Sequence, residues 1–423
     1  MVTPNKNKPL FLGLTHMGQV YSSAWSQEIG PCAIYDFNKI ILENFKQKKF
    51  TQEEPKLNNL SKKKKITFLN NENEIAKYSL IFFTYDTPID EKNGYPKLLL
   101  IEKLIKKLFS INYKRKTVII ISSQVYPGFM DKIKKKYKSK KKIKLLYMVD
   151  TLKMGQAINN FLHPDQLIFG GDKKDEKMIK LIFQKFKCKK YLFNYKEAEL
   201  IKISINLYLF FSVTYANMLD DLGRENNIKF PKILNVLRND RRIGQYSYIH
   251  PSLGMAGGHL ERDSFYFQKI NRNFILKKIL SQMLKFNDLR KNILEKEIKN
   301  IVNKRIINIL LVGISYKKKS FSLVNSIFSK LLKNKKFKIK IFDDHYDLVE
   351  FKEINTMKNL DLIKNFDIII YNYSKNKTIQ ILKSFLKKNK KKYLLNISFD
   401  QKNIFDGPNV KNIFSKELIN ISK

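Results

Sequence analysis

Short apolar runs rich in β-branched and aromatic residues alternate with amphipathic stretches in the first part of the chain. They are Pro9–Leu12, Cys32–Tyr35, Leu80–Thr84, Thr117–Ser122, Lys144–Met148 and Leu167–Gly170. This alternation is typical of a parallel sheet covered by helices. It resumes after Lys304 with Ile306–Val312, Phe337–Phe342, Asp367–Tyr371 and Tyr393–Ile397. The pattern therefore predicts an α/β fold with two doubly wound parallel sheets.

Between these two parts the pattern is helical. Residues 196–226 predict one long apolar helix, and residues 271–303 a second helical stretch without strand signals. The most apolar run, residues 203–219, contains serines and asparagines and falls short of the ~20 clean apolar residues of a membrane span. We therefore expect a buried helix, no membrane partner and three domains. Their predicted ranges are 1–195, 196–303 and 304–423, the central one helical and involved in dimerisation.

Composition narrows the class of protein. A chain of 423 residues is too long for one core, and 43% hydrophobic residues indicate a globular protein. The net charge of +44 at pH 7 comes mainly from lysines spread in runs along the whole chain, which is typical of solvated surfaces more than of one nucleic-acid stripe. The first residues lack a secretory signal, and two cysteines without metal-ligand spacing indicate the cytoplasm and no metal site.

The first predicted strand runs into the glycine turn Leu12-Gly13-Leu14-Thr15-His16-Met17-Gly18, and Asp36 follows the second strand. This is the layout of a Rossmann-like dinucleotide fold, in which glycines allow a tight turn, approach of the pyrophosphate and helix packing, and the acid binds ribose. Thr15 replaces the middle glycine, so its Cβ should push the pyrophosphate outward or require a shifted loop. An ordinary β–α turn is the alternative. The candidate cofactor-binding residues here are Gly13, Thr15, Met17, Gly18 and Asp36.

Further motifs follow in a fixed order. They are Tyr85-Asp86-Thr87-Pro88, Ser122-Ser123-Gln124 with Pro127-Gly128, Met154-Gly155-Gln156-Ala157, and Ala198-Glu199 with Lys202 and Asn206. In this order the chain resembles the UDP-glucose/GDP-mannose dehydrogenase family over nearly its whole length. The resemblance implies two Rossmann-like domains joined by a helical domain, a nucleotide-sugar substrate and a homodimer on the long helix. It also implies NAD bound by Thr87, Ser123 and Gln124, and Asp36 favours NAD over NADP.

The predicted long helix carries a polar stripe. Glu199, Lys202, Asn206 and Asn217 are spaced to share one face of an otherwise apolar helix, and such side chains need partners. A structural Lys–Glu pair with a capping asparagine is one explanation. The resemblance implies instead that Lys202 and Asn206 hold the reacting sugar hydroxyl and stabilise negative charge on it, with Asp150 in the same substrate site.

The resemblance also places a substrate loop near Pro251–Asp263, after Arg242-Ile243-Gly244. It implies that Arg242, Tyr248 and Gly254 contact substrate, as does Lys317 in the last domain. The family's loop carries a catalytic cysteine, whereas His259 or, with a one-residue shift, Leu260 stands there, and Asp263 is retained.

Two further family positions differ: Met154 replaces a hydrolytic glutamate, and Val324 replaces an arginine of the last domain. The candidate catalytic residues are therefore Lys202, Asn206, His259 and Asp263.

Three functions are open on this sequence. The first is an NAD-dependent oxidoreductase that oxidises C6 of a UDP- or GDP-sugar without a thiol, by a single two-electron step or through a hydrate with His259 as general base. The second is a catalytically inactive homologue that binds nucleotide sugar or NAD in a regulatory role. The third is a basic scaffold for nucleic acid, supported by charge alone; we expect no specific nucleic-acid partner.

Overall fold

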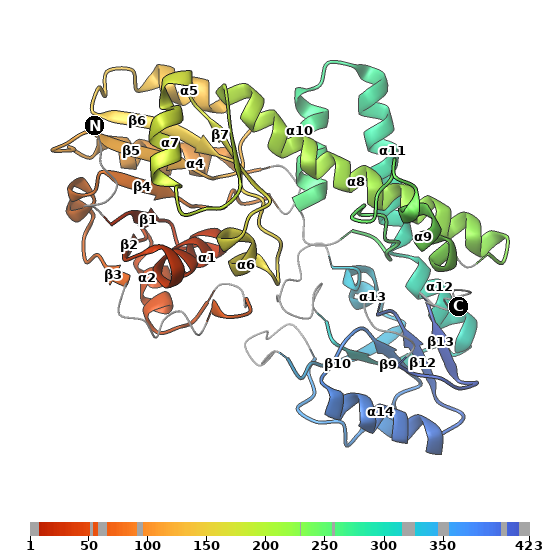
Figure 1. Cartoon of the computed structure of the whole chain (residues 1–423). Coiled ribbons are helices and arrows are strands. Elements are labelled where there is room, and N and C mark those ends of the chain that lie inside the picture. Colours follow the sequence, from red (N-terminus) through yellow and green to blue (C-terminus); the bar gives the residue numbers. More distant parts are fainter. Residues whose placement is uncertain are drawn as a thin grey trace, which may run out of the picture. The chain divides into compact units, whose positions relative to one another are not determined.

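The computed structural model describes residues 8–50, 54–57, 66–90, 96–228, 230–255, 259–314, 326–345, 355–398 and 404–413. The chain forms two compact units (Figure 1). Unit 1 comprises Met1–Asn206 and Phe265–Phe267, and unit 2 comprises Leu207–Ser264 and Gln268–Lys423. This division falls inside the long helix, and the three domains expected from the sequence stay a prediction.

Unit 1 is built on an eight-stranded sheet of order β3-β2-β1-β4-β5-β6-β7-β8. The strands are β1 Leu10–Leu12, β2 Cys32–Tyr35, β3 Ile66–Phe68, β4 Leu80–Phe83, β5 Thr117–Ile121, β6 Ile143–Met148, β7 Gln166–Gly170 and β8 Lys189–Phe193. The first six run parallel, as predicted. The strand order reverses beside β1, so the topological switch point lies at the carboxyl ends of β1 and β4, where ligands of open α/β sheets bind; we call this edge of the sheet the crevice edge.

One strand junction differs from the wholly parallel sheet that we expected. Strand β7 pairs with β6 antiparallel, Tyr147 opposite Gly170, and β8 then runs parallel to β7. The helix between β6 and β7, α6 Ala157–Leu162, has six residues. At 1.5 Å per residue it is too short to run back along a six-residue strand, so the chain returns as an antiparallel neighbour.

The remaining elements of unit 1 cover this sheet and close one large core. They are α1 His16–Ala24, the π-helical turn η2 Trp25–Ile29, α2 Lys39–Lys46, η3 Glu72–Lys77, α4 Leu98–Ser110, α5 Phe129–Lys136, η4 Lys173–Asp175 and α7 Glu176–Ile182. The long helix α8 Tyr195–Glu225 begins in unit 1, close to the predicted range, and continues into unit 2. Among the described residues, no helix is both long and apolar enough to cross a membrane.

Unit 2 combines helices with a five-stranded parallel sheet of order β10-β9-β11-β12-β13. Its strands are β9 Ile307–Val312, β10 Phe337–Phe342, β11 Ile368–Tyr371, β12 Tyr393–Asn396 and β13 Val410–Asn412. Its other elements are α9 Phe230–Asn239, α10 His259–Ile270 apart from Phe265–Phe267, α11 Phe274–Arg290, α12 Ile293–Ile301, α13 Ser329–Lys333, η5 Ile363–Asn365 and α14 Asn376–Lys388. Alternate residues of β9 belong to two core clusters, which shows that both faces of this sheet are buried.

Candidate functional site

The glycine turn between β1 and α1 packs as tightly as the sequence predicts. Gly13 has a φ of +103°, and a Cβ there would lie 2.6 Å from the Tyr85 ring. A Cβ on Gly18 would lie 1.7 Å from the carbonyl oxygen of Gly13. The first glycine is therefore needed for backbone conformation, and the last for the close approach of helix and strand.

Thr15, at the position of the middle glycine, ties the turn to the end of β4. Its hydroxyl donates to the Thr84 carbonyl oxygen at 2.9 Å and accepts from the Asp86 amide at 2.9 Å. The amide of Met17 in turn donates to Asp86 Oδ2 at 3.3 Å. The substitution thus brings a carboxylate to the first turn of α1. The sequence did not indicate this contact, because Asp86 is 69 residues away from Met17 in the chain.

Asp36 holds the same turn from the end of β2. Its carboxylate accepts from the Leu14 amide at 2.6 Å, the Asn38 amide at 2.7 Å and the Tyr85 hydroxyl at 3.2 Å. Burial raises the pKa of this 1% exposed carboxyl, and the hydrogen bonds oppose that shift. These contacts organise the turn, and binding of a ribose by Asp36 stays a prediction.

The two polar turns at the carboxyl ends of β4 and β5 lie together, as expected for neighbouring parallel strands. Thr87 Oγ1 donates to the Gln124 carbonyl oxygen at 2.6 Å, and the Thr87 amide donates to Gln124 Oε1 at 3.2 Å. Ser123 Oγ donates to the Tyr85 carbonyl oxygen at 2.6 Å. All three predicted cofactor residues are thus buried and placed at the crevice edge of the sheet.

Lys202 and Asp150, predicted from different motifs, meet in unit 1. Lys202 Nζ donates to the Asp150 carbonyl oxygen at 2.6 Å, and the Tyr21 hydroxyl donates to Asp150 Oδ1 at 3.1 Å. Burial, followed by the charge of Asp150, raises the pKa of Tyr21 well above its usual value. Asn206 is also buried, one helical turn after Lys202. Sequence reasoning missed Tyr21, although a buried tyrosine on α1 needs a hydrogen-bond partner.

A buried glutamate reaches the loop where Met154 stands. Glu54 Oε1 accepts from the Gly155 amide at 2.7 Å and lies 3.1 Å from His16 Nε2, and Glu54 Oε2 accepts from the Ala157 amide at 3.3 Å. The carboxylate of Glu54 thus caps the start of α6 and contacts His16, the first residue of α1. No sequence pattern indicated these contacts, because Glu54 belongs to no periodic segment or motif.

Glu199, on the polar stripe of α8, caps another helix. Its carboxylate accepts from the Gly128 amide at 2.6 Å and the Met130 amide at 2.7 Å, at the start of α5. Glu199 therefore bonds backbone amides of α5, which differs from the Lys–Glu pair that we considered as an alternative. Burial outweighs the two hydrogen bonds and raises the pKa of Glu199 to about 7.

This shift predicts a pH dependence of stability. Because the folded-state pKa of about 7 exceeds the ordinary 4.5, stability from this group is complete below pH 4.5 and is lost as the pH rises through 7. The loss is at most about 3 kcal/mol. We expect Glu199→Gln to remove this loss of stability at high pH. The measurement is the urea midpoint as a function of pH, followed by the fluorescence of Trp25, the single tryptophan. Glu43→Gln, which replaces an exposed glutamate of α2, is the matched control. A wild-type-like pH profile of stability in Glu199→Gln would contradict the prediction.

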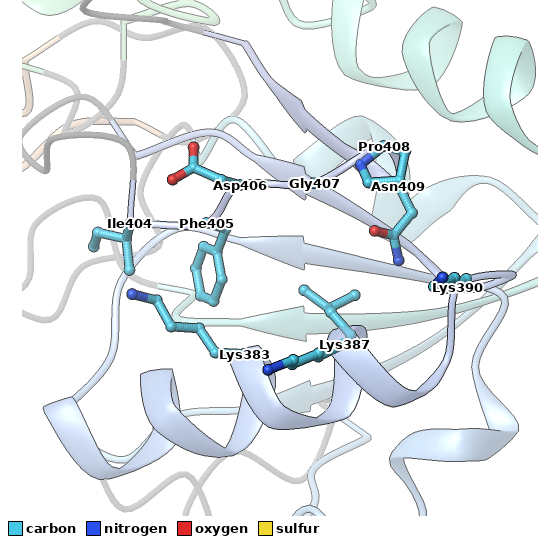
Figure 2. A pocket seen from close by; sticks show the side chains of 10 residues that line it. Lys383, Lys387, Lys390, Ile404, Phe405, Asp406, Gly407, Pro408 and Asn409 are labelled. Carbon is cyan, nitrogen blue, oxygen red and sulfur yellow. The ribbon is translucent and has the colours of Figure 1, made fainter.

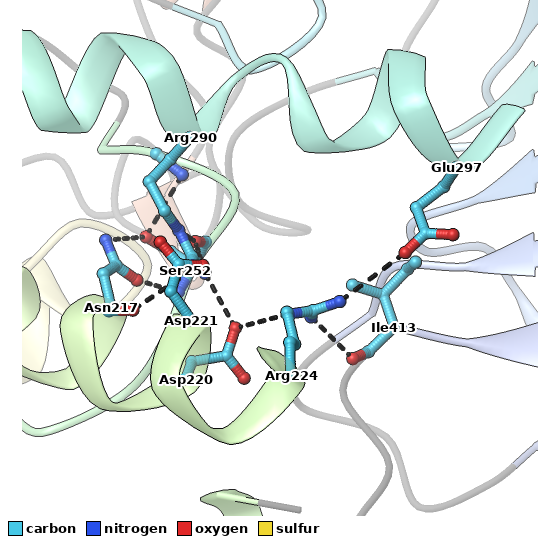
Figure 3. A network of polar contacts seen from close by, with 9 residues as sticks. Asn217, Asp220, Asp221, Arg224, Ser252, Arg290, Glu297 and Ile413 are labelled. Carbon is cyan, nitrogen blue, oxygen red and sulfur yellow. Dashed lines mark hydrogen bonds and ion pairs between the residues drawn. The ribbon is translucent and has the colours of Figure 1, made fainter. Parts of the chain in front are cut away.

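In unit 2 a polar network anchors the start of the predicted substrate loop (Figure 3). Asn217 Oδ1 accepts from the Ser252 amide at 2.7 Å. The guanidinium of Arg290 donates to the Ser252 carbonyl oxygen at 2.7 Å and to Asp220 Oδ2 at 2.9 Å, and it also bonds Asp221. Asn217, which we grouped with Lys202 and Asn206, therefore holds the loop backbone.

The end of this loop is also held by protein groups. The Met255 amide donates to Asn287 Oδ1 at 2.6 Å, and Asn287 Nδ2 donates to Glu261 Oε1 at 2.8 Å. Asp263 forms a buried ion pair with Arg262, 2.7 Å between Nε and Oδ1. An Arg262–Asp263 pair is a structural alternative to the catalytic role predicted for Asp263, and that role stays a prediction.

The other predicted substrate residues of unit 2 are not brought together by the described contacts. Gly254, with a φ of +117°, packs against Lys291, while Tyr248 is 40% exposed. Arg242 pairs with Asp240 in an exposed turn, 2.6 Å between Nη2 and Oδ2. The side chain of His259 and all of Lys317 lie outside the described residues, as does Val324.

A pocket of about 390 Å³ lies beside α14 in unit 2 (Figure 2). Lys383, Lys387 and Lys390 line it together with the buried side chain of Phe405. Lys390 lies three residues before β12 and Asn409 immediately precedes β13, so the pocket lies where these parallel strands begin. Ligands of such sheets bind at the opposite, carboxyl ends, and we do not count this pocket as the candidate site.

Comparison with known proteins points to one family. Residues 8–187 match the NAD binding domain of the UDP-glucose/GDP-mannose dehydrogenase family, and residues 196–289 match its central domain. A UDP-N-acetyl-D-mannosamine dehydrogenase of Methanocaldococcus jannaschii is 26% identical over 332 residues, 76% of this chain and 74% of the relative. A UDP-glucose 6-dehydrogenase of Campylobacter jejuni is 28% identical over 254 residues, 58% of this chain and 61% of the relative.

The fold agrees with solved structures. A UDP-glucose dehydrogenase from Pyrobaculum islandicum superimposes with a TM-score of 0.81 at 16% identity, covering 98% of this chain and 99% of that one. A UDP-D-ManNAc dehydrogenase from Pyrococcus horikoshii gives a TM-score of 0.76 at 16% identity, covering 97% and 100%. These likenesses confirm the predicted fold class, in which α/β sheets precede and follow a helical region along the chain.

Proposed function

This chain belongs to the UDP-glucose/GDP-mannose dehydrogenase family, and we propose that it oxidises C6 of a UDP- or GDP-sugar with NAD, without a thiol nucleophile. The observation that carries the proposal is the meeting of Lys202 with Asp150 and Tyr21. Asp150 follows the carboxyl end of β6, on the edge of the sheet where ligands of open α/β folds bind, and this supports a role of the cluster in binding substrate next to the cofactor.

NAD, when bound, supplies the acceptor for the hydride of the sugar C6 carbon. The protein residues have the task of stabilising the alkoxide that precedes hydride loss. Lys202 is 9% exposed, so its ammonium acts where water screens little and stabilises a developing negative charge strongly. Asn206, on the same face of α8, adds a second hydrogen-bond donor to the sugar hydroxyl.

The two cysteines support chemistry without a thiol. Burial of Cys32 in β2 raises the pKa of its thiol to about 12, and burial also raises the pKa of Cys188. A thiolate is the nucleophilic form, so neither side chain is primed to form a thioester. The reaction we propose therefore stops at the aldehyde or its hydrate. Two free thiols also support the cytoplasm as the location.

A second candidate function is a binding protein that has lost turnover. It is favoured by Thr15, which closes the glycine turn onto β4 where the family motif opens it to the pyrophosphate. Such a protein would bind nucleotide sugar and release no NADH.

An apolar stripe on α8 supports a homodimer. Tyr208, Phe211, Tyr215, Met218 and Leu222 are 43–60% exposed and recur every three or four residues, which places them on one face of the helix. Exposed apolar faces of this kind are typical of protein interfaces, and the identical stripe of a second copy has the same chemistry.

Turnover with a sugar-nucleotide panel tests the function. Purified protein is mixed with NAD and UDP- and GDP-sugars, and absorbance at the NADH band is followed. We expect one NADH per sugar, an aldehyde or hydrate product, and a dimer when the same sample is sedimented. Two NADH per sugar with a carboxylate product would contradict the proposed two-electron reaction. Binding of sugar nucleotide without NADH would favour the second function instead.

A further inference from the structure

The first turn of α1 carries a carboxylate of the protein itself. The Met17 amide, the second of this helix, donates to Asp86 Oδ2. Backbone amides at a helix start have no partner within the helix and attract anions. In dinucleotide folds the cofactor's pyrophosphate occupies this position.

The position of Asp86 is fixed by its backbone. Its amide donates to Thr15 Oγ1, and the same hydroxyl donates to the Thr84 carbonyl oxygen, both at 2.9 Å. Because the main chain on either side of the crevice is tied in this way, the carboxylate is held against α1. Thr15 therefore positions the Asp86 carboxylate at the first turn of α1.

Two glycines of the turn favour NAD binding, whereas the Asp86 carboxylate opposes it. Gly13 and Gly18 give the close helix–strand approach that a dinucleotide site needs. Asp86 adds a negative charge where two negative phosphates have to bind. We propose that Asp86 competes with the cofactor pyrophosphate for the first turn of α1, so that NAD binds when this carboxyl is protonated or displaced and affinity falls as pH rises.

The charged groups around Asp86 have opposite effects on its ionisation. His16, the first residue of α1, favours the carboxylate, and Asp150 beyond β6 opposes it. His16 is itself held by Glu54, and Asp150 is contacted by Tyr21 and Lys202. Burial is the largest cause and raises the pKa of Asp86 above its ordinary value of 3.8. Protonation on cofactor binding is therefore less costly than for an exposed aspartate.

Replacement of Asp86 with asparagine tests the proposal. Asparagine keeps an acceptor for the Met17 amide and removes the charge, so the fold is retained, which a thermal melt without ligand checks. NADH affinity is measured by its fluorescence at pH 5 to 8. We expect Asp86→Asn to bind NADH at least about ten-fold tighter than wild type at pH 8, which corresponds to about 1.4 kcal/mol. The ratio of the two affinities is expected to shrink as the pH is lowered.

Three probes separate charge from other effects. ADP-ribose, which has the pyrophosphate but no nicotinamide, should show the same gain as NADH, and adenosine should show none. Asp90→Asn, a carboxylate of the same loop that pairs with Lys97 at 4.0 Å, is the matched control and should leave affinity unchanged. The pH dependence of wild-type affinity provides a measurement that needs no variant.

Equal affinities of wild type and Asp86→Asn at every pH would overturn the proposal, as would weaker binding by the variant or an equal gain for adenosine. If neither protein binds NADH at millimolar concentration, Asp86 is not what limits binding, and the proposal fails as well. The experiment uses no sugar and reads no turnover. It can therefore succeed where the proposed oxidation fails, and the reverse.

Discussion

Replacing Arg290 with alanine is expected to destabilise unit 2 by about 3–5 kcal/mol, the usual cost of removing one partner from a buried ion pair. Arg290 is 1% exposed and holds Asp220 Oδ2 at 2.9 Å together with Asp221 and the Ser252 carbonyl oxygen. Without it, Arg224 is the remaining ion-pair partner of Asp220 among the described residues, and it donates to the same oxygen at 2.9 Å. The predicted substrate loop loses one of its anchors at Ser252 in the same step, while Asn217 still accepts from the Ser252 amide (Figure 3).

Urea unfolding followed by far-ultraviolet circular dichroism measures this loss. Trp25 fluorescence reports unit 1, so its transition should move less than the dichroism transition. Arg242→Ala removes an exposed arginine that also pairs with an aspartate, and its transitions should match wild type. Combining Arg290→Met with Asp220→Asn and Asp221→Asn should restore part of the stability, because both carboxylates that Arg290 neutralised are then uncharged, while Arg224 keeps Glu297 at 3.7 Å. A wild-type urea midpoint for Arg290→Ala would show that the network does not stabilise unit 2 and would contradict the prediction.

Replacing Gly18 with alanine is expected to cost more than about 3 kcal/mol, the upper end for an overpacked site. The added Cβ would lie 1.7 Å from the Gly13 carbonyl oxygen and 2.7 Å from Thr84 Oγ1. The nearest atom belongs to the backbone and cannot rotate away. Helix α1 must therefore move off β1, which also displaces Thr15 and Asp86 from the crevice.

Trp25 directly follows α1 and packs against Phe11 and Phe82, so its fluorescence reads this displacement. We expect a lower urea midpoint by fluorescence and weaker NADH binding in Gly18→Ala. Gly30→Ala is the matched control, because a Cβ there meets nothing within 4 Å and its backbone is extended. That variant should be neutral or slightly more stable. Similar midpoints for the two alanine variants would refute the packing argument.

Most of the strands that the sequence predicted are largely buried, as in β1, β2, β4 and β5, whose residues are all buried. β2 and β10 begin and end at the predicted residues; β10, at the edge of its sheet, is only partly buried, and its alternating apolar residues gave the signal. The missed strands β3, β8 and β13 lie at the ends of their sheets, and their residues are largely exposed or half-buried. A partly exposed strand needs no continuous apolar run, so it has little sequence signal.

The candidate site divides in the same way. Gly13, Gly18, Thr87 and Lys202 could be found from the sequence, because a tight turn, a strand end or a polar position on an apolar helix each depends on neighbours close in the chain. The partners Tyr21, Glu54 and Asp86 could not be found, because their contacts join residues 38 to 129 positions apart.

The sequence by itself determined the alternation of strands and helices and the glycine turn, since these follow from local periodicity and residue identity, while the absence of the family cysteine from the loop stays a prediction. The tertiary structure alone decided what each polar group does. It turned Asp36 inward to hold the turn, assigned Glu199 to cap α5, and brought Asp86 to the first turn of α1. The physical reason is that a buried polar atom takes the partner that the packing of distant segments leaves within hydrogen-bond distance, and no local pattern encodes that partner.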